Sequence, residues 1–277
     1  MINRTEQNRE KRIFSKLTEH YNEALSLGHE VFCVVLQGSQ NYNLDIYSDK
    51  YKSDIDTKAI LLPSFDDFCK GYQPTSTTHV RENNEHIDLK DIRVMFETFK
   101  KQNVNFVEIL FSDYFIVPSK YECYWMRLRE LGESLTHCHP SQTLKTMAGL
   151  SYEKRKALCH PYPTIKDKID KYGYDGKQLH HIIRINEFIK NYVSGVSFKK
   201  CLTLHDGKIL DMLVNSKLNE YSLDEAIEIA DRLNAETEAI KNNFIETRWT
   251  PFDGSPYKTL EDIKVNILKQ WFKEQLI

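Results

Sequence analysis

The stretch VVLQGSQNYNLDIYSDKYKSDIDTKAILL, from Val34 to Leu62, decides the fold of this chain. It opens with β-branched and apolar residues, stops at Gly38-Ser39, passes through a polar loop and becomes apolar again. The pattern predicts two buried strands, Glu30 to Gln37 and Ser53 to Leu62. Two aspartates stand one residue apart where the second strand begins, and their neutralisation needs an explanation.

Length and composition bound the class of protein. The chain has 277 residues, 40% hydrophobic and 12% aromatic residues and a net charge of −2, which is typical of a globular protein with one large domain or two modest ones. The near-neutral charge indicates no general attraction to nucleic acid. The charged N-terminus lacks the apolar core of a signal peptide, and no run of about 18 apolar residues occurs. The six cysteines include no CxxC pair. We expect a soluble protein of a bacterial or phage-infected cytosol, with no membrane partner.

The first part of the chain predicts a mixed domain at residues 1 to 120. Apolar positions at three-to-four spacing predict a helix from Arg4 to Leu27, ended by Gly28. A short helix is expected at Ser64 to Lys70, after a Ser cap. The alternating segment Glu85 to Ile92 predicts a third strand, and Arg93 to Lys101 predicts the helix after it.

The second part, 121 to 277, predicts an α-helical domain that closes over a ligand of the first. Helical periodicity recurs in six segments: 121–131, 141–158, 177–193, 208–214, 223–241 and 259–275. The expected fold class is therefore α+β, a small mixed β-sheet domain with a C-terminal helical domain.

The paired aspartates point to metal chemistry. Residues two apart in a strand point to the same face, so Asp54 and Asp56 project together, and their charges repel unless a cation lies between them. Hard oxygen ligands suit Mg²⁺, or Mn²⁺ in its place. If the strand with Asp88 is a neighbour, Asp88 completes a three-carboxylate site, with Ile87 and Leu89 on the opposite face. Such a site can hold two metals roughly 4 Å apart for attack at phosphorus.

Gly38-Ser39 completes the pattern. A glycine after a strand lets the backbone approach a phosphate, and Ser39 offers a hydroxyl and an N–H. By itself, a DxD is more often a solvated turn. The ordered set of strand, Gly-Ser, loop, DxD, strand and later carboxylate favours nucleotidyl transfer.

At these residues the chain resembles the DNA polymerase beta-like nucleotidyltransferase superfamily. It is most similar to a bacterial and phage branch of predicted nucleotidyltransferases, some of them linked to RNA repair. That branch has GSxxYG, SDxD and a phrase near NPNVLELL, and this chain has GSQNYN, SDID and NVNFVEILF (103–111). KYGYDGKQLHHIIRI (171–185) is similar to the branch's Gly-Tyr, Lys, His, Arg helix. The likeness covers about residues 30 to 240.

The resemblance implies a role for each matching residue. Gly38 and Ser39 would hold the triphosphate of an NTP such as ATP, Asp54 and Asp56 would bind the metals, and Asp88 would be the third ligand and activate the attacking hydroxyl. Three further residues, at helical spacing, would bind the nucleotide: Lys177, His181 and Arg184. His180 is an equal candidate for that face, and without the resemblance the helix reads as a solvated one with one buried histidine.

Two features near the site depart from the branch, and the role of two others stays open. Asn43 stands where the branch has glycine, and the loop from Gln40 to Ser53 is longer than usual, which puts the choice of acceptor in doubt. Three tyrosines are either packing residues or stacking platforms for a base: Tyr42, Tyr47 and Tyr51. The Lys-rich segment 154–171 is either a solvated helix face or a nucleic-acid groove.

The expected activity is the Mg-dependent transfer of an NMP from an NTP to a hydroxyl, with release of pyrophosphate. The favoured acceptor is a nucleic acid, either an RNA, tRNA or DNA end. The alternatives are a protein or small-molecule hydroxyl, and an antitoxin-like protein that binds nucleotide without turnover. The sequence does not specify the preferred base, the number of nucleotides added or the oligomeric state.

Overall fold

The computed structural model describes residues 4–42, 44–46, 51–203, 206–248 and 251–276. The chain divides into two compact units. The first unit comprises residues 1–43, 53–138 and 253–277, and the second comprises 44–52 and 139–252.

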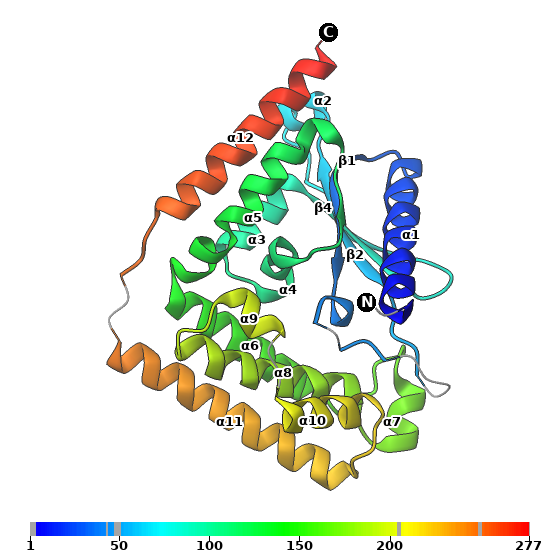
Figure 1. Ribbon diagram of the computed structural model, residues 1–277, viewed down its shortest axis with the longest axis vertical. Coiled ribbons are helices and arrows are strands. Elements are labelled where there is room, and N and C mark those ends of the chain that lie inside the picture. Colours follow the sequence, from blue (N-terminus) through cyan, green and yellow to red (C-terminus); the bar gives the residue numbers. More distant parts are fainter. Residues whose placement is uncertain (1–3, 43, 47–50, 204–205, 249–250, 277) are drawn as a thin grey trace. The chain divides into compact units, whose positions relative to one another are not determined.

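A five-stranded mixed sheet forms the centre of the first unit (Figure 1). Its strands, in the order β3-β4-β2-β1-β5, are β3 (Ser76–Val80), β4 (His86–Asp91), β2 (Asp56–Leu62), β1 (Glu30–Gln37) and β5 (Phe115–Ile116). β2 runs parallel to β4 and antiparallel to β1. The edge strands β3 and β5 are antiparallel to their neighbours. Because β1 and β2 are antiparallel, the end of β1 lies beside the start of β2.

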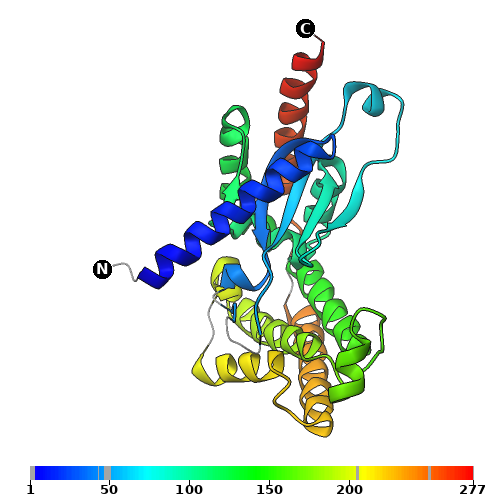
Figure 2. The same cartoon turned by 90° about the vertical axis from the view of Figure 1, so that its right-hand side faces the viewer.

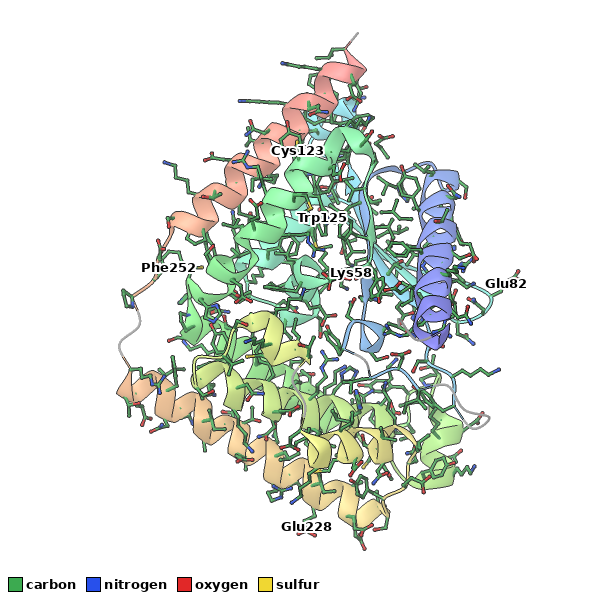
Figure 3. The ribbon with its side chains drawn as sticks, viewed as in Figure 1. Lys58, Glu82, Cys123, Trp125, Glu228 and Phe252 are labelled. Carbon is green, nitrogen blue, oxygen red and sulfur yellow. The ribbon has the colours of Figure 1, made fainter. Side chains whose placement is uncertain are left out.

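Helices cover both faces of this sheet. Figure 2 shows α1 (Arg4–Ser26), in dark blue, crossing one face. The opposite face carries α3 (Ile92–Lys100), α5 (Glu122–His137) and α12 (Ser255–Gln275). On that face the ring of Trp125 in α5 lies 6.4 Å from the ring of Phe32 in β1, which joins the helix to the strand. Trp125 is labelled in Figure 3. The unit's remaining helices are short: η1 (Ser39–Tyr42), α2 (Phe65–Cys69), α4 (Val104–Val107), η2 (Glu108–Phe111) and η3 (Ser119–Tyr121).

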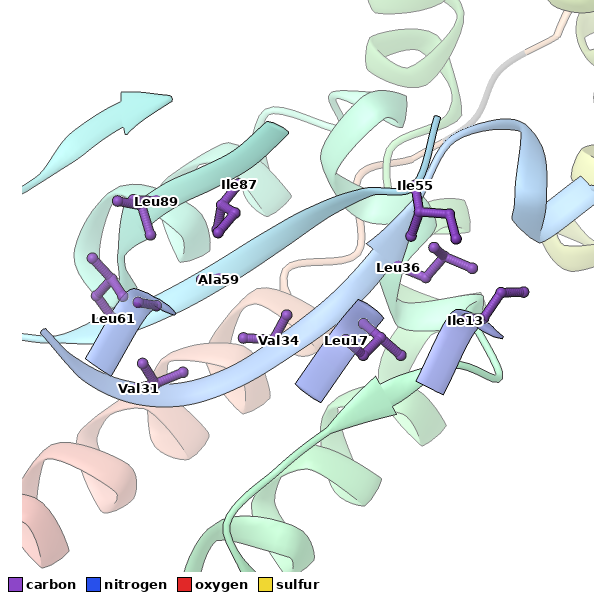
Figure 4. Close-up of a cluster of buried hydrophobic side chains, with 11 residues drawn as sticks. Ile13, Leu17, Val31, Val34, Leu36, Ile55, Ala59, Leu61, Ile87 and Leu89 are labelled. Atoms are coloured by element: carbon purple, nitrogen blue, oxygen red, sulfur yellow. The ribbon is translucent and has the colours of Figure 1, made fainter. Parts of the chain in front are cut away.

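The core beneath α1 shows which way each strand residue faces (Figure 4). Ile13 and Leu17 of α1 pack against alternate residues of the strands. These strand residues and their neighbour before β2 are Val34, Leu36, Ile55, Ala59, Leu61, Ile87 and Leu89. Since strand residues alternate between faces, the residues between them point to the other side of the sheet.

The second unit is a helical bundle around α8 (Gly176–Val193). α8 packs against α6 (Pro140–Ala157), α9 (Phe198–Thr203), α10 (Gly207–Lys217) and α11 (Leu223–Thr247). The short helix α7 (Lys166–Tyr172) completes its helices within the described residues. The Asn186 amide donates to the carbonyl of Leu233 at 3.2 Å and so fixes α8 against α11.

The α+β fold class is confirmed, with strands β1, β2 and β4 and most helices close to their predicted ranges. The chain divides differently from the predicted boundary at 120/121, because α5 and α12 belong to the sheet unit. Trp125 of α5 is fully buried, and Trp271 of α12 donates to the carbonyl of Pro63 at 2.7 Å. Helical periodicity identifies an apolar face but not the surface that it covers.

Two strands, the three α-helices α4, α7 and α9, and the short 3-10 helices of the described residues were not predicted from the sequence. β3 (STTHV) is mostly exposed and has no apolar alternation, and β5 has two residues. α7 and α9 are too short for a periodic signal. None of the helices among the described residues has the length and apolar character that crossing a membrane requires. All six cysteines are free thiols.

Candidate functional site

The first element of the candidate site is the turn after β1. Gly38 has a φ of +81°, a left-handed conformation that strains any residue with a Cβ. A Cβ placed there would meet no atom within 4 Å, so the space above Gly38 is open. The amide of Asn41 donates to the Gly38 carbonyl at 3.0 Å and closes the turn around half-buried Ser39. This turn has the backbone that close approach of a phosphate needs.

Side chains hold this turn in place and tie it to the aspartates. The side-chain Nδ2 of Asn41 donates to the Leu36 carbonyl at 2.8 Å, and the Ser112 hydroxyl donates to Asn41 Oδ1 at 2.7 Å. Gln40 Nε2 donates to the backbone carbonyl of Asp54 at 3.3 Å. The Gly-Ser turn and the DxD segment therefore belong to one hydrogen-bonded assembly.

Asp54 and Asp56 flank a residue that points into the core. Ile55 is 3% exposed and packs under α1, and Asp56, the first residue of β2, points to the opposite face of the sheet. β2 begins at Asp56 rather than at the predicted Ser53, so Asp54 precedes the strand and strand alternation does not set the direction of its side chain. Asp54 is exposed and Asp56 is half-buried. Asp56 Oδ1 accepts a hydrogen bond from the backbone N–H of His86 at 2.9 Å. In the β1–β2 ladder Asp56 is the partner of Gln37, the residue before Gly38.

Asp88 lies on the neighbouring strand, on the same face. β2 and β4 are parallel neighbours, and Asp88 is the ladder partner of Lys58, two residues beyond Asp56. Ile87 and Leu89 point into the α1 core, as the alternation predicted.

The carboxylate of Asp88 is occupied by cations. One oxygen lies 2.8 Å from Lys58 Nζ, and the other lies 3.1 Å from Lys90 Nζ and accepts from the Thr78 hydroxyl at 3.2 Å. Burial raises the pKa of Asp88, but Lys58 and Lys90 outweigh it and hold that pKa below its ordinary value. Asp88 is therefore a buried, ionised carboxylate with two lysine partners.

These contacts bear on the predicted metal site. Asp54 and Asp56 supply the two hard oxygen ligands with which Mg²⁺ commonly binds beside phosphate oxygens. Asp88 as placed is bound to lysines, and within the described ranges no three His, Cys, Asp or Glu side chains are grouped so that they could hold a metal. Asp54 and Asp56 are thus of the ligand type that Mg²⁺ takes beside a phosphate, whereas Asp88, paired with Lys58 and Lys90, does not fit the three-carboxylate arrangement.

The segment NVNFVEILF supports the site from behind. The Tyr42 hydroxyl donates to the Glu108 carboxylate, and both side chains are buried. The Phe106 ring lies beneath Lys58, whose Nζ is 4.0 Å from the ring centroid. Tyr42 is thus a support of the turn rather than a surface for stacking.

Lys58 is the residue that sequence reasoning missed. It is 4% exposed within β2, where a lysine requires a carboxylate partner. A lysine inside an apolar strand, two residues after Asp56, is a signal that the sequence itself contains. Lys58 is labelled in Figure 3.

The second unit contains the predicted cationic face. Lys177 is exposed on the first turn of α8, while His181 and Arg184 are half-buried. Burial lowers the pKa of His181 well below its ordinary value, and the cations Lys154 and Arg184 lower it further. Because Lys154 and Arg184 both affect the pKa of His181, we group them with Lys177 and His181 as a cationic cluster, to which α6 contributes Lys154.

Asp175 and His180 lie next to this cationic cluster but do not belong to it. Burial lowers the pKa of Lys154, Lys177 lowers it further, and Asp175 opposes them. Asp175 is buried and caps α8 by accepting from the amide of Lys177 at 3.1 Å. His180, the other candidate, is buried with its Nδ1 3.0 Å from the Leu213 carbonyl, so it belongs to the α8–α10 packing.

Asn43, Tyr47 and residues 48 to 50 of the long loop lie outside the described residues. No protein-family model matches this chain, and a search of curated proteins finds no match. The likeness to nucleotidyltransferases therefore depends on the quoted motifs and remains a prediction.

Proposed function

We propose that the protein is a metal-dependent nucleotidyltransferase that moves an NMP from an NTP to a hydroxyl, preferably on a nucleic-acid end. One observation carries the proposal. Asp56 lies opposite Gln37 in the β1–β2 ladder, so the left-handed Gly38 turn starts one residue from the DxD pair. A phosphate-binding turn beside paired carboxylates is the combination that transfer at phosphorus needs.

In this proposal the backbone at Gly38-Ser39 and the Ser39 hydroxyl bind the triphosphate. Asp54 and Asp56 hold Mg²⁺ against it, and the ion would neutralise phosphate charge and lower the pKa of the acceptor hydroxyl. Asp88 is ionised but bound to Lys58 and Lys90, so it orients these ammonium groups. It could take the acceptor's proton only after losing one of them.

The cationic cluster of the second unit supports a polyanionic substrate. Burial lowers the pKa of His181, the cations Lys154, Arg184 and Lys177 lower it further, and a bound phosphate would offset the effect of these cations. Arg binds phosphate as a planar fork and Lys as a point charge. The proposed reaction takes place in a bacterial or phage-infected cytosol, where NTPs and free thiols occur together.

A second candidate is a nucleotide-binding protein without turnover. The occupation of Asp88 by two lysines favours it, because a third carboxylate that cannot bind metal would leave binding intact and slow chemistry.

The test is incubation with α-labelled NTPs and Mg²⁺ beside RNA, DNA and a cell lysate. We expect label in RNA or DNA, and Asp56→Asn should reduce it by about 100-fold or more, because charge placement supplies most of such catalysis. Asp66→Asn, which removes an exposed carboxylate of α2, is the matched control. Label in a protein band would move the acceptor to protein. NTP binding without pyrophosphate release on any acceptor would select the second candidate.

A further inference from the structure

A second basic site lies in the helical unit, apart from the cationic cluster on α8. It is a cavity of about 580 Å³ bordered by α7, by the end of α10 and by Tyr51. The residues that give it chemical character are Tyr51, Lys168, Lys171, Tyr172, Lys217 and Glu220. Cavities of 300 to 1,000 Å³ are typical of small-molecule and nucleotide sites. Sequence reasoning weighed Tyr51 and the 154–171 segment separately, and the fold brings parts of both to one cavity.

The walls of this cavity are fixed to each other. Asn219 Nδ2 donates to the Tyr174 carbonyl at 3.2 Å, and the Tyr174 hydroxyl donates to the Tyr221 carbonyl at 2.9 Å. These bonds hold the chain after α7 against the connection between α10 and α11. Lys217 Nζ donates to the Leu44 carbonyl at 2.7 Å, so a lysine of the cavity wall also holds the chain at Leu44. The cavity is therefore a built feature rather than a gap beside a loop.

Its charge and its aromatic rings favour one kind of ligand. Three lysines against one glutamate leave the lining positive. Lys171 Nζ lies 4.7 Å from the ring centroid of Tyr172, which is 36% exposed at the end of α7. Cations that follow a phosphate backbone, next to aromatic faces that accept any base, are typical of single-stranded nucleic-acid sites.

We propose that this cavity binds a single-stranded nucleic-acid segment, with a base against Tyr172 and phosphates at Lys168 and Lys171. It would hold the acceptor strand, an assignment that rests on the proposed function. Carboxylates can accept hydrogen bonds from base amino groups, so Glu220 gives the base edge a partner inside the cavity.

The test is fluorescence anisotropy of the full chain with a labelled single-stranded RNA 12-mer, without NTP or metal. Tyr172→Ala should weaken binding by about tenfold through lost stacking, and Tyr172→Phe should keep the affinity. The matched control is Tyr152→Ala on α6, which removes an exposed tyrosine with its own lysine, Lys156, at 4.4 Å. Equal losses in Tyr172→Ala and Tyr152→Ala would overturn the proposal.

A salt titration tests the lysines. Lys168→Gln with Lys171→Gln should reduce the slope of log affinity against log salt by about 1.4, since each single-strand phosphate contact contributes about 0.7. Lys166→Gln with Lys200→Gln removes two exposed lysines outside the cavity and should change the slope much less. An unchanged slope in the first pair contradicts the proposal.

Competition identifies the form of the ligand. AMP at tenfold excess over the strand should displace little of it, and full displacement would overturn the strand assignment in favour of a free nucleotide.

The anisotropy assay needs no transfer, so strand binding without label transfer would sink the proposed function alone. Label transfer in a protein whose Tyr172 variants bind RNA normally would sink this proposal alone.

Discussion

Cations shift the pKa of both Asp88 in the sheet unit and His181 in the helical unit, but they stabilise the charged form of Asp88 and disfavour the charged form of His181. Lys58 and Lys90 lie against Asp88 and keep its pKa below the ordinary value. Burial lowers the pKa of His181, and the cations Lys154, Arg184 and Lys177, which would repel a protonated ring, lower it further, so the imidazole stays neutral. The charge of Asp88 is neutralised by cations of the protein itself, whereas the cations around His181 would be stabilised by a bound anion.

The difference separates a supporting contact from a binding surface. Charges buried in fixed pairs stabilise a geometry, and removing one partner exposes the other to a large desolvation penalty. Like charges gathered on a helix face destabilise the folded state slightly and are relieved by a ligand of opposite sign. We therefore expect opposite responses when one cation is removed from each region.

The largest expected effect is that of Lys58→Met. This change leaves buried Asp88 with Lys90 alone and should lower the free energy of unfolding by about 3 kcal/mol, the lower end of the range for a broken buried pair. Urea unfolding followed by tryptophan fluorescence measures it. Lys70→Met is the control, because its ion pair with Asp66 is exposed and should contribute less than about 1 kcal/mol. Equal effects of the two changes would show that Asp88 does not depend on Lys58.

The pH dependence of stability should separate the two regions. The pKa of His181 is lowered in the folded protein, so as the pH falls this histidine is protonated in the unfolded chain before it is protonated in the folded one. The free energy of unfolding therefore decreases as the pH falls below about 6.5, the ordinary pKa of histidine, by at most about 1.4 kcal/mol per pH unit. Asp88 has a depressed folded pKa, so its contribution is present above its unfolded value of about 3.9 and disappears only as pH falls through the lower folded value.

Comparison of the wild-type protein with His181→Gln between pH 7.5 and 5 isolates the first effect. His20, whose pKa is also lowered, mainly by burial, is present in both proteins and cancels. The free energy of unfolding of the wild-type protein should fall relative to that of His181→Gln as the pH becomes more acid. A difference that stays constant over this range would mean that His181 keeps an ordinary pKa.

The smallest expected effect is that of Lys154→Met. Removal of this half-buried cation relieves repulsion with Lys177 and Arg184, and we expect a gain of up to about 1 kcal/mol in unfolding free energy. NMR titration of the His181 ring should show its pKa rising toward the ordinary value. A loss of stability in Lys154→Met would indicate that Lys154 has a compensating partner, and the contrast with Lys58 would fail.

Local patterns along the chain determined much of the architecture. The apolar runs before Gly38 and after Asp56 specified β1 and β2, and the helical spacing of Lys177, His181 and Arg184 placed them on one face of α8. Glycine at position 38 matched a left-handed turn. These features depend on neighbours two to seven residues away, which periodicity and turn chemistry encode directly.

Long-range partners were decided only by the tertiary structure. The parallel pairing of β2 with β4 brought Lys58 to Asp88, the packing of α6 on α8 brought Lys154 to His181, and α12 joined the sheet unit from the far end of the chain. Each contact joins segments that local patterns describe separately. Which of these contacts form depends on the total free energy of the packed unit, because burial and charge pairing act over the whole unit. No single stretch of sequence specifies that total.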